Sequence, residues 1–324
     1  MTILVTGCAG FIGSYVVRAL LVRGETVIGV DNLNDYYTPT LKRARLQQFE
    51  GDKAFQFLEI DIADHELLRE QTKSANITSI IHLAAQAGVR YSLTDPFAYS
   101  RSNLQGHLAI LELARHLSVR HLVYASSSSV YGANEAVPFK ETQPCDNPVS
   151  LYGATKKSNE LMSASYARLY ALPQTGLRFF TVYGPMGRPD MAYWIFTEKM
   201  LRGEPIEVFN HGKMGRDFTY IDDIVDGVLA AHDRPPVGDG VPHRIYNLGN
   251  DRPEALMTLI ELLEKELGLK AEKTLVGMQR GDVERTWADI TLARRDLGFQ
   301  PKITLAEGIS RFVAWRRGLA APFV

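Results

Sequence analysis

Three glycines near the start of the chain, Gly7, Gly10 and Gly13, constrain its fold more than any other feature. A short apolar run over residues 2–6 precedes them and an apolar-faced segment, Tyr15–Val22, follows, which predicts a buried strand, a tight turn and a helix. In such a unit the first glycine permits the turn, the second lets backbone approach a pyrophosphate, and the third lets helix pack on strand. The free N–H groups at the helix N-terminus favour phosphate. The sequence therefore predicts a dinucleotide-binding site.

An acidic residue follows the second predicted strand. Residues 26–30 form this strand and Asp31 ends it, within about 20 residues of the glycine turn, where a carboxylate holds ribose hydroxyls. A carboxylate there repels a 2′-phosphate, so we expect NAD rather than NADP. The alternative, a glycine-rich turn in an unrelated α/β protein, leaves the strand, the helix and Asp31 unexplained together.

Strand and helix patterns alternate along the first part of the chain. Further strands are predicted over 55–59, 79–83, 121–125 and 175–180, and long helices over 103–117 and 152–172. This pattern predicts an α/β fold, a Rossmann-type doubly wound parallel sheet, with a smaller C-terminal substrate-binding lobe. We expect residues 1–180 to form the NAD-binding domain, with part of 217–245 returning to it, and 181–324 to form mainly a smaller second lobe that covers the cofactor cleft. Ligands bind at the carboxyl ends of such strands, where Asp61, Ile62, Ala84 and the serines 126–129 lie.

The bulk properties exclude several classes of partner. The 324 residues carry a formal net charge of −1 and no block of Lys or Arg, so a nucleic-acid partner is not expected. Cys8 and Cys145 are the only cysteines, which argues against a metal site or a disulfide framework. No apolar stretch approaches the length of a membrane helix, and a strand starting at residue 2 leaves no room for a signal peptide. We expect a cytoplasmic protein without a membrane partner.

Tyr152 and Lys156 form a candidate proton-transfer pair. Four residues apart on a predicted helix, they project from one face. A tyrosine with a pKa of about 10 is a poor base at neutral pH, and we expect the ammonium of Lys156 and a positive nicotinamide to lower it. The phenolate would take the proton of a substrate hydroxyl while the carbinol hydrogen leaves as hydride. There are two alternatives: the Tyr-x-x-x-Lys spacing occurs by chance, and the serines 126–129 form a loop that faces solvent. Both are disfavoured because these residues follow a strand end of a predicted dinucleotide-binding fold.

Several longer motifs give the chain a family resemblance. The glycine turn, Ser127-Ser-Ser-Val-Tyr-Gly132, Tyr152-Gly-Ala-Thr-Lys156 and Arg216–Asp223 resemble the extended short-chain dehydrogenase/reductases, in the nucleotide-sugar epimerase and dehydratase group. Residues 31–37, 82–91 and 178–191 are similar to UDP-glucuronate 4-epimerases, which usually carry Trp where this chain has Met186. This resemblance covers essentially the whole chain.

The resemblance implies roles for individual residues. Ser127, Tyr152 and Lys156 would be catalytic, and Lys156 would also hold the nicotinamide ribose. Phe179 and Phe180 would lie beside the nicotinamide. The expected dinucleotide contacts are Gly7, Gly10, Phe11, Ile12, Gly13, Asp31, Asn32, Asp61, Ile62, Leu83, Ala84, Ala85, Asn103, Tyr152, Lys156 and Phe179. The expected substrate contacts are Arg90, Ser127, Ser128, Ser129, Tyr152, Thr181, Arg188, Arg216 and Asp282.

Two arginines bear on the substrate. Arg188 is the candidate reader of a uronic acid carboxylate, because arginine binds carboxylates with two parallel bonds; a solvated loop arginine is the alternative. Arg216 would bind the diphosphate and Asp282 a uridine ribose. Gln279 stands where UDP-glucose epimerases have a second arginine, and Arg280 follows it.

His82 is expected to be a buried strand-end residue rather than a catalytic one.

The resemblance implies an NAD-dependent 4-epimerase that interconverts UDP-glucuronic and UDP-galacturonic acid through a transient 4-keto sugar with retained cofactor. UDP-glucuronate decarboxylase and UDP-glucose 4-epimerase are the alternatives. A 4,6-dehydratase is disfavoured because Ser128 and Ser129 stand where those enzymes typically carry Asp-Glu. A dinucleotide-sensing regulatory protein would not need Tyr152 and Lys156. The helices that begin near Asn103 and Tyr152 are expected to pair with their copies in a homodimer.

Overall fold

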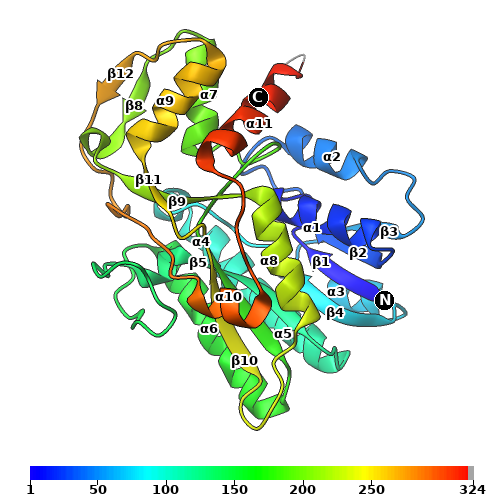
Figure 1. Cartoon of the computed structure of the whole chain (residues 1–324). Coiled ribbons are helices and arrows are strands. Elements are labelled where there is room, and N and C mark those ends of the chain that lie inside the picture. Colours follow the sequence, from blue (N-terminus) through cyan, green and yellow to red (C-terminus); the bar gives the residue numbers. More distant parts are fainter. Residues whose placement is uncertain (320–324) are drawn as a thin grey trace.

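A parallel seven-stranded sheet forms the centre of the computed structural model, which describes residues 1–319 (Figure 1). The strand order is β10-β6-β5-β4-β1-β2-β3, and within it 3-2-1-4-5-6 is the order of dinucleotide-binding folds. The predicted fold class is confirmed. The strands of this sheet are β1 (Thr2–Thr6), β2 (Thr26–Asp31), β3 (Phe55–Glu59), β4 (Ile77–His82), β5 (Leu122–Ser127), β6 (Gln174–Phe179) and β10 (His243–Leu248).

Helices cover both faces of the sheet. On one face α1 packs against α8, and α10 packs beside α8 on β10; on the other, α5 packs between α3 and α6 (Figure 1). Successive residues of β1 serve the two layers, because Ile3 and Val5 join one apolar cluster and Leu4 joins the other. These helices are α1 (Phe11–Val22), α3 (His65–Thr72), α5 (Gly106–His116), α6 (Leu151–Tyr170), α8 (Ile221–Asp233) and α10 (Thr291–Leu297).

The chain after residue 180 builds a smaller lobe and also returns to the large sheet. Two small sheets, β11-β9-β7 and β12-β8, lie beside α7, α9 and α11 (Figure 1), while α8 and β10 belong to the layers of the large sheet. The lobe elements are β7 (Thr181–Tyr183), α7 (Ala192–Leu201), β8 (Ile206–Val208), β9 (Gly215–Tyr220), β11 (Pro253–Ala255), α9 (Leu256–Leu267), β12 (Lys273–Leu275) and α11 (Leu305–Arg317). The short helices α2 (Pro39–Gln47) and α4 (Pro96–Tyr99) belong to the N-terminal part.

Several element boundaries differ from the sequence prediction, and two of these differences involve buried polar side chains. The fifth strand extends through Ser127 into the serine run, because the side chain of Ser126 is buried and bonded to a carboxylate on α6. The helix expected from Asn103 begins earlier, because α4 runs directly into a π-helical turn over Ser100–Gln105, and α5 follows from Gly106. Both differences place polar side chains inside the protein, where their partners are remote in sequence and therefore invisible to a pattern of apolar spacing.

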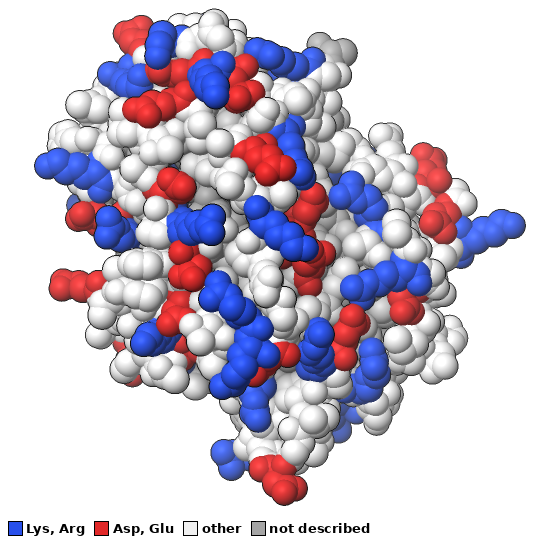
Figure 2. All heavy atoms as spheres, in the orientation of Figure 1, with Lys and Arg blue, Asp and Glu red and all other residues white. Residues whose placement is uncertain are grey.

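The surface carries charges of both signs. On the face drawn in Figure 2, lysine and arginine side chains alternate with aspartate and glutamate and form no large field of one sign. Within residues 1–319, no helix has the length and apolarity needed to cross a membrane. The same residues contain no group of three or more His, Cys, Asp or Glu side chains suited to hold a metal ion.

Candidate active site

One cavity of about 890 Å³ collects the predicted site residues at the carboxyl edge of the large sheet. Its wall is formed by the ends of β1, β2, β4, β5 and β6, the start of α6, and segments of the C-terminal lobe. The predicted residues that line it are Gly7, Gly10, Phe11, Ile12, Gly13, Asp31, Asn32, Asp61, Ile62, Leu83, Ala84, Ala85, Arg90, Ser127, Ser128, Ser129, Tyr152, Lys156, Phe179, Thr181, Arg188, Arg216 and Asp282. Gly7 and Asp282, 275 positions apart in sequence, therefore line one site.

Asn103 is the predicted contact that does not line the cavity. It is buried behind the loop that follows β4, where its Oδ1 accepts the N–H of Gln86 at 2.8 Å and its Nδ2 donates to the Gln86 carbonyl at 3.0 Å. Its Nδ2 also donates to Thr155 Oγ1 on α6 at 3.0 Å. Asn103 thus joins the loop to the helix that carries Tyr152, and a direct cofactor contact stays a prediction.

The glycine turn has the geometry that a pyrophosphate requires. Gly7 adopts a left-handed φ of +73°, and a Cβ on Gly13 would lie 2.0 Å from the Gly7 carbonyl oxygen. Gly10 is the N-cap of α1, and no side chain caps this end. The first N–H groups of α1 therefore remain available to an anion in the cavity, so the residues present fit a dinucleotide.

Asp31 ends β2 with its carboxylate held by two backbone N–H groups. Its Oδ2 accepts from Ala9 at 3.2 Å and its Oδ1 from Leu33 at 2.9 Å. Burial raises the pKa of Asp31, and these bonds and the nearby Lys42 oppose the shift. Asp31 thus ends β2 at the place where the sequence predicts ribose binding, and that role stays a prediction. Lys42, which the sequence analysis missed, lines the same end of the cavity and donates to the backbone and side-chain oxygens of Asn34 at 2.5 and 2.6 Å.

Helix α6 presents Tyr152 and Lys156 to the cavity. Its N-cap, Ser150, accepts the N–H of Gly153 at 3.1 Å, and this bond fixes where the helix begins. The Lys156 ammonium donates to the Ala125 carbonyl on β5 at 2.9 Å, and burial lowers its pKa to about 8. Burial raises the pKa of Tyr152, while the Ser127 hydroxyl and the charge of Arg188 act in the opposite direction. Lys156 is not among the groups that lower the pKa of Tyr152 in the protein alone, and the lowering expected from Lys156 together with a bound nicotinamide stays a prediction.

The four serines after β5 have different partners. The Ser126 hydroxyl donates to Glu160 Oε1 at 2.7 Å. Ser127 Oγ accepts the N–H of Ser129 at 3.1 Å and lies 3.2 Å from its hydroxyl, where a short helical turn begins. The Ser127 hydroxyl is also the one serine group that lowers the pKa of Tyr152. Its catalytic role, which the resemblance implies, stays a prediction.

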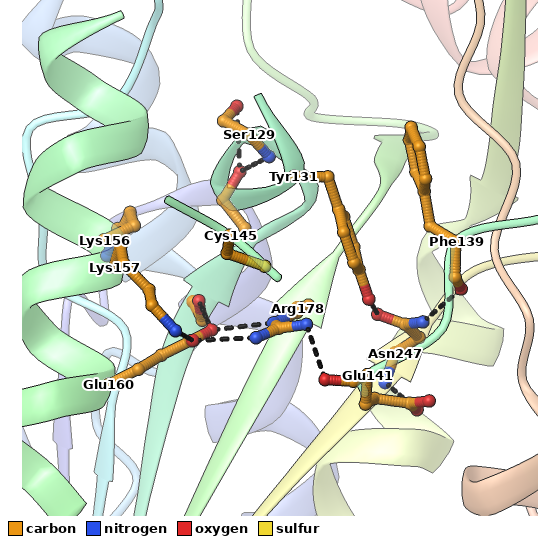
Figure 3. Close-up of polar contacts among 12 residues, drawn as sticks. Ser129, Tyr131, Phe139, Glu141, Cys145, Lys156, Lys157, Glu160, Arg178 and Asn247 are labelled. Atoms are coloured by element: carbon orange, nitrogen blue, oxygen red, sulfur yellow. Dashed lines mark hydrogen bonds and ion pairs between the residues drawn. The ribbon is translucent and has the colours of Figure 1, made fainter. Parts of the chain in front are cut away.

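A buried network behind these groups joins α6 to both neighbouring strands (Figure 3). Arg178 on β6 donates to Glu160 through Nε and Nη2, each at 2.8 Å, and both side chains are 2% exposed. Burial acts to raise the pKa of Glu160, but Arg178 outweighs it and holds the pKa below its usual value. The sequence analysis missed this pair. The spacing of Glu160, four residues after Lys156 and eight after Tyr152, was the available signal.

Arg188 is held at the cavity wall by an acid that the sequence analysis also missed. Its Nε donates to Asp190 Oδ1 at 3.0 Å and its Nη2 contacts Asp190 Oδ2 at 2.5 Å. Tyr36, after β2, donates to the same Oδ2 at 2.9 Å. Burial acts to lower the pKa of Arg188, but Asp190 outweighs it, so Arg188 stays protonated.

Arg45 on α2 supports the segment that leads to Arg188. This fully buried guanidinium donates to the carbonyls of Met186 and Gly187 at 2.7 and 2.8 Å, and to that of Ala9 at 2.9 Å. Met186 has a left-handed φ of 52°. The glycine turn and the Arg188 segment are therefore joined through one side chain.

The far end of the cavity carries the candidate diphosphate groups. Arg216 donates to Asp282 Oδ1 at 2.7 Å, so the two predicted contacts form an ion pair. The guanidinium of Arg90 lies 4.9 Å from the centre of the Phe209 ring. Arg280 lines the cavity and Gln279 does not. His82 is buried at the end of β4 and bonded to Thr6 Oγ1 at 2.7 Å, as expected for a structural residue.

Comparisons with known proteins show which sequences and structures this chain resembles. UDP-glucuronate 4-epimerase 4 of Arabidopsis thaliana is 49% identical over 328 residues, covering 97% of this chain and 75% of the relative. UDP-glucuronic acid 4-epimerase from Bacillus cereus, solved with UDP-glucuronic acid and NAD, has a TM-score of 0.89 at 34% identity, over 98% of this chain and 99% of that one. UDP-glucose 4-epimerase from Thermotoga maritima, solved with UDP-glucose, has a TM-score of 0.88 at 35% identity over the same shares.

The chain also matches the sequence model of a protein family. The model described as "NAD dependent epimerase/dehydratase family" matches residues 3–249, which include the glycine turn, the serine run, Tyr152 and Lys156. This confirms the family resemblance that the sequence motifs indicated. The chain belongs to the NAD-dependent epimerase/dehydratase family.

Proposed function

We propose that this protein interconverts UDP-glucuronic acid and UDP-galacturonic acid by inverting C4 of the sugar, with NAD retained throughout. The observation that carries the proposal is the meeting of Tyr152, Ser127, Lys156 and Arg188 in one cavity that also contains the glycine turn and Asp31. The similarity to UDP-glucuronate 4-epimerases supports the choice of sugar.

The side chains divide the work. Bound NAD supplies a positive nicotinamide that accepts a hydride from C4 and returns it to the opposite face of the sugar. Tyr152 takes the C4 hydroxyl proton and later gives it back, which is the role of a general acid–base group. Ser127, in contact with Tyr152, orients the same oxygen. Lys156, fixed by the Ala125 carbonyl, holds positive charge beside the reacting groups at neutral pH.

Arg188 can bind a second carboxylate without leaving Asp190. Asp190 occupies the Nε and Nη2 edge of the guanidinium, and the structure records no hydrogen bond for Nη1 within residues 1–319. The opposite edge, formed by Nη1 and Nη2, therefore remains for a bidentate contact with the C5 carboxylate of a uronic acid. Asp190 and Tyr36 keep this edge oriented.

The remaining predicted contacts complete the proposal. Asp31 and the glycine turn hold NAD. Arg216 binds the diphosphate once its ion pair with Asp282 has opened, and Asp282 then binds the uridine ribose. Arg90, Ser128, Ser129 and Thr181 contact the sugar. In this scheme residues 1–180 with part of 217–245 bind the dinucleotide and 181–324 bind mainly the nucleotide sugar.

The test of the activity is product analysis. Incubation with UDP-glucuronic acid and identification of the product by NMR should show UDP-galacturonic acid and no loss of CO₂. UDP-xylose as the product would instead identify a decarboxylase. Conversion of UDP-glucose to UDP-galactose at equal efficiency would identify a general 4-epimerase. The similarity to the UDP-glucose 4-epimerase from Thermotoga maritima is the reason to test this second candidate.

We also propose a homodimer formed through α5 and α6. Leu108 on α5 and Leu161, Leu169 and Tyr170 on α6 are exposed by 42 to 67%, and self-complementary helix faces form two-fold interfaces readily. Sedimentation at micromolar concentration should give twice the chain mass of 36.2 kDa, and a mass near the single value would refute the dimer. The two unpaired thiols, Cys8 and Cys145, support the cytoplasm as the compartment.

A further inference from the structure

A buried ion pair lies one helical turn beyond the proton-transfer groups, and no step of the proposed reaction uses it. Glu160 on α6 and Arg178 on β6 are each 2% exposed, and buried charges are costly unless they are paired and fully bonded. Replacing such a pair by apolar side chains is often neutral for stability. Stability alone therefore gives no reason for these two charges to lie here.

The helix puts Glu160 in line with both reacting residues. Tyr152, Lys156 and Glu160 follow one another at intervals of four on α6, so they share one face of the helix. That face packs on β5 and β6 (Figure 3). Fixing Glu160 against these strands therefore fixes the axial position and rotation of the face that carries the phenol and the ammonium.

The strand side of the contact is equally specific. Three consecutive residues of β5 each act on a different member of this face: the Ala125 carbonyl accepts from Lys156 at 2.9 Å, the Ser126 hydroxyl donates to Glu160 at 2.7 Å, and the Ser127 hydroxyl lowers the pKa of Tyr152. Arg178 precedes Phe179, which lines the cavity. A slip of the helix against β5 would disturb all three contacts together.

We infer that Glu160, clamped by Arg178 and Ser126, is a positioning residue that sets the register of Tyr152 and Lys156 against Ala125 and Ser127 during proton transfer. The inference rests on the proposed function and deepens it. It assigns Glu160 no contact with substrate or cofactor. Its effect passes through geometry, and a misplacement of about 1 Å can cost about 100-fold in rate.

The experiment compares two changes in the clamp with a matched change elsewhere. Glu160→Gln removes the carboxylate at constant size, and Ser126→Ala removes only the bond from β5 while the ion pair remains. The control is Glu198→Gln: Glu198 on α7 forms the same two-bond pair with Arg316 on α11, with side chains 12 and 11% exposed, away from the reacting groups. Each protein is measured for melting temperature, NAD content, kcat, KM for UDP-glucuronic acid and the pH dependence of kcat.

We expect kcat to fall at least about tenfold in Glu160→Gln and about threefold in Ser126→Ala, with KM within about twofold, because orientation rather than binding is lost. The acid limb of kcat should move to higher pH, because the contact with Ser127 lowers the pKa of Tyr152. Glu198→Gln should lower the melting temperature by a similar amount as the clamp variants do, and it should keep the kcat and the pH profile of the wild type.

Two results would overturn the inference. One is a kcat within about twofold of the wild type in both clamp variants; the other is a loss of activity that follows only the loss of folded, NAD-containing protein, as in the control. If Glu160→Gln does not fold, Ser126→Ala decides alone. An ultraviolet phenolate titration, taken as the difference from the matching Tyr152→Phe protein, reports the pKa of Tyr152 without turnover. It tests the clamp even if the wild type fails on UDP-glucuronic acid, a failure that would refute only the proposed substrate.

Discussion

Arg188→Ala should convert a uronate-selective site into one that no longer favours the acidic sugar. The guanidinium lines the cavity, holds its charge, and keeps one edge free of recorded bonds while Asp190 occupies the other. Removing it deletes the cationic partner of a substrate carboxylate. A neutral sugar in the same pocket loses no such partner.

The magnitude follows from the environment of the pair. Truncating one member of a desolvated, bonded charge pair costs about 2–5 kcal/mol, and about 1.4 kcal/mol is tenfold in an equilibrium constant. The side chains of Asp190 and Arg188 are 31 and 24% exposed. Solvent screening therefore lowers the expected free-energy cost below the upper end of this range. We therefore expect kcat/KM on UDP-glucuronic acid to fall about 10- to 1000-fold.

The assay measures kcat/KM on UDP-glucuronic acid and UDP-glucose with the same preparation. Asp190 loses its cation in Arg188→Ala, so Arg188→Ala/Asp190→Ala is the control that removes the stranded acid as well. Both variants should lose efficiency on the acidic sugar and keep any weak activity on UDP-glucose. Parallel loss on both sugars in a folded protein would show that Arg188 does not read the carboxylate.

Three further predictions concern other parts of the site. Tyr152→Phe should bind substrate as the wild type does but lose about 10²–10⁴-fold in turnover, and retention of more than about a tenth of the activity would reject the acid–base role. Gly13→Ala should purify with little NAD, because its Cβ would lie 2.0 Å from the Gly7 carbonyl oxygen; full NAD content would contradict the packing argument. Burial raises the pKa of Asp217 from 3.8 to about 6, so the folded protein binds the Asp217 proton more tightly than the unfolded chain does. The protonated carboxyl therefore stabilises the folded state fully below pH 3.8, and this contribution is lost as the pH rises through about 6. Denaturant titrations should show a loss of up to about 3 kcal/mol over that window, absent in Asp217→Asn; equal slopes in the two proteins would exclude Asp217 as the cause.

The parts of the site that are local in sequence were predictable. A glycine turn, an acid at the end of the next strand and a Tyr-x-x-x-Lys pair each follow from spacing within one supersecondary unit, and their strand ends converge because the sheet is parallel. His82 could be set aside on the same reasoning, as a residue of a buried strand. The helix predicted from Asn103 begins earlier, because a π-helical turn over Ser100–Gln105 joins α4 to α5.

The partners of charged side chains were not predictable from spacing. Asp190 lies two residues from Arg188, yet Tyr36, from a loop about 150 residues earlier, joins the same carboxylate. Arg45 resembles a surface helix residue in sequence but is fully buried on carbonyl oxygens. The pKa of Tyr152 likewise depends on burial, which sequence spacing does not report.

The sequence by itself determined the fold class and the family, and it predicted the dinucleotide turn and the candidate proton-transfer pair, because each depends on short-range backbone geometry or on motifs that are contiguous in the chain. Only the tertiary structure decided which groups share an environment: Glu160 with Arg178 and Ser126, Arg188 with Asp190, and Arg216 with Asp282. Charge pairing and desolvation act through space over a few ångströms. The orientation of the reacting groups therefore depends on contacts between strands and helices that the order of residues does not display.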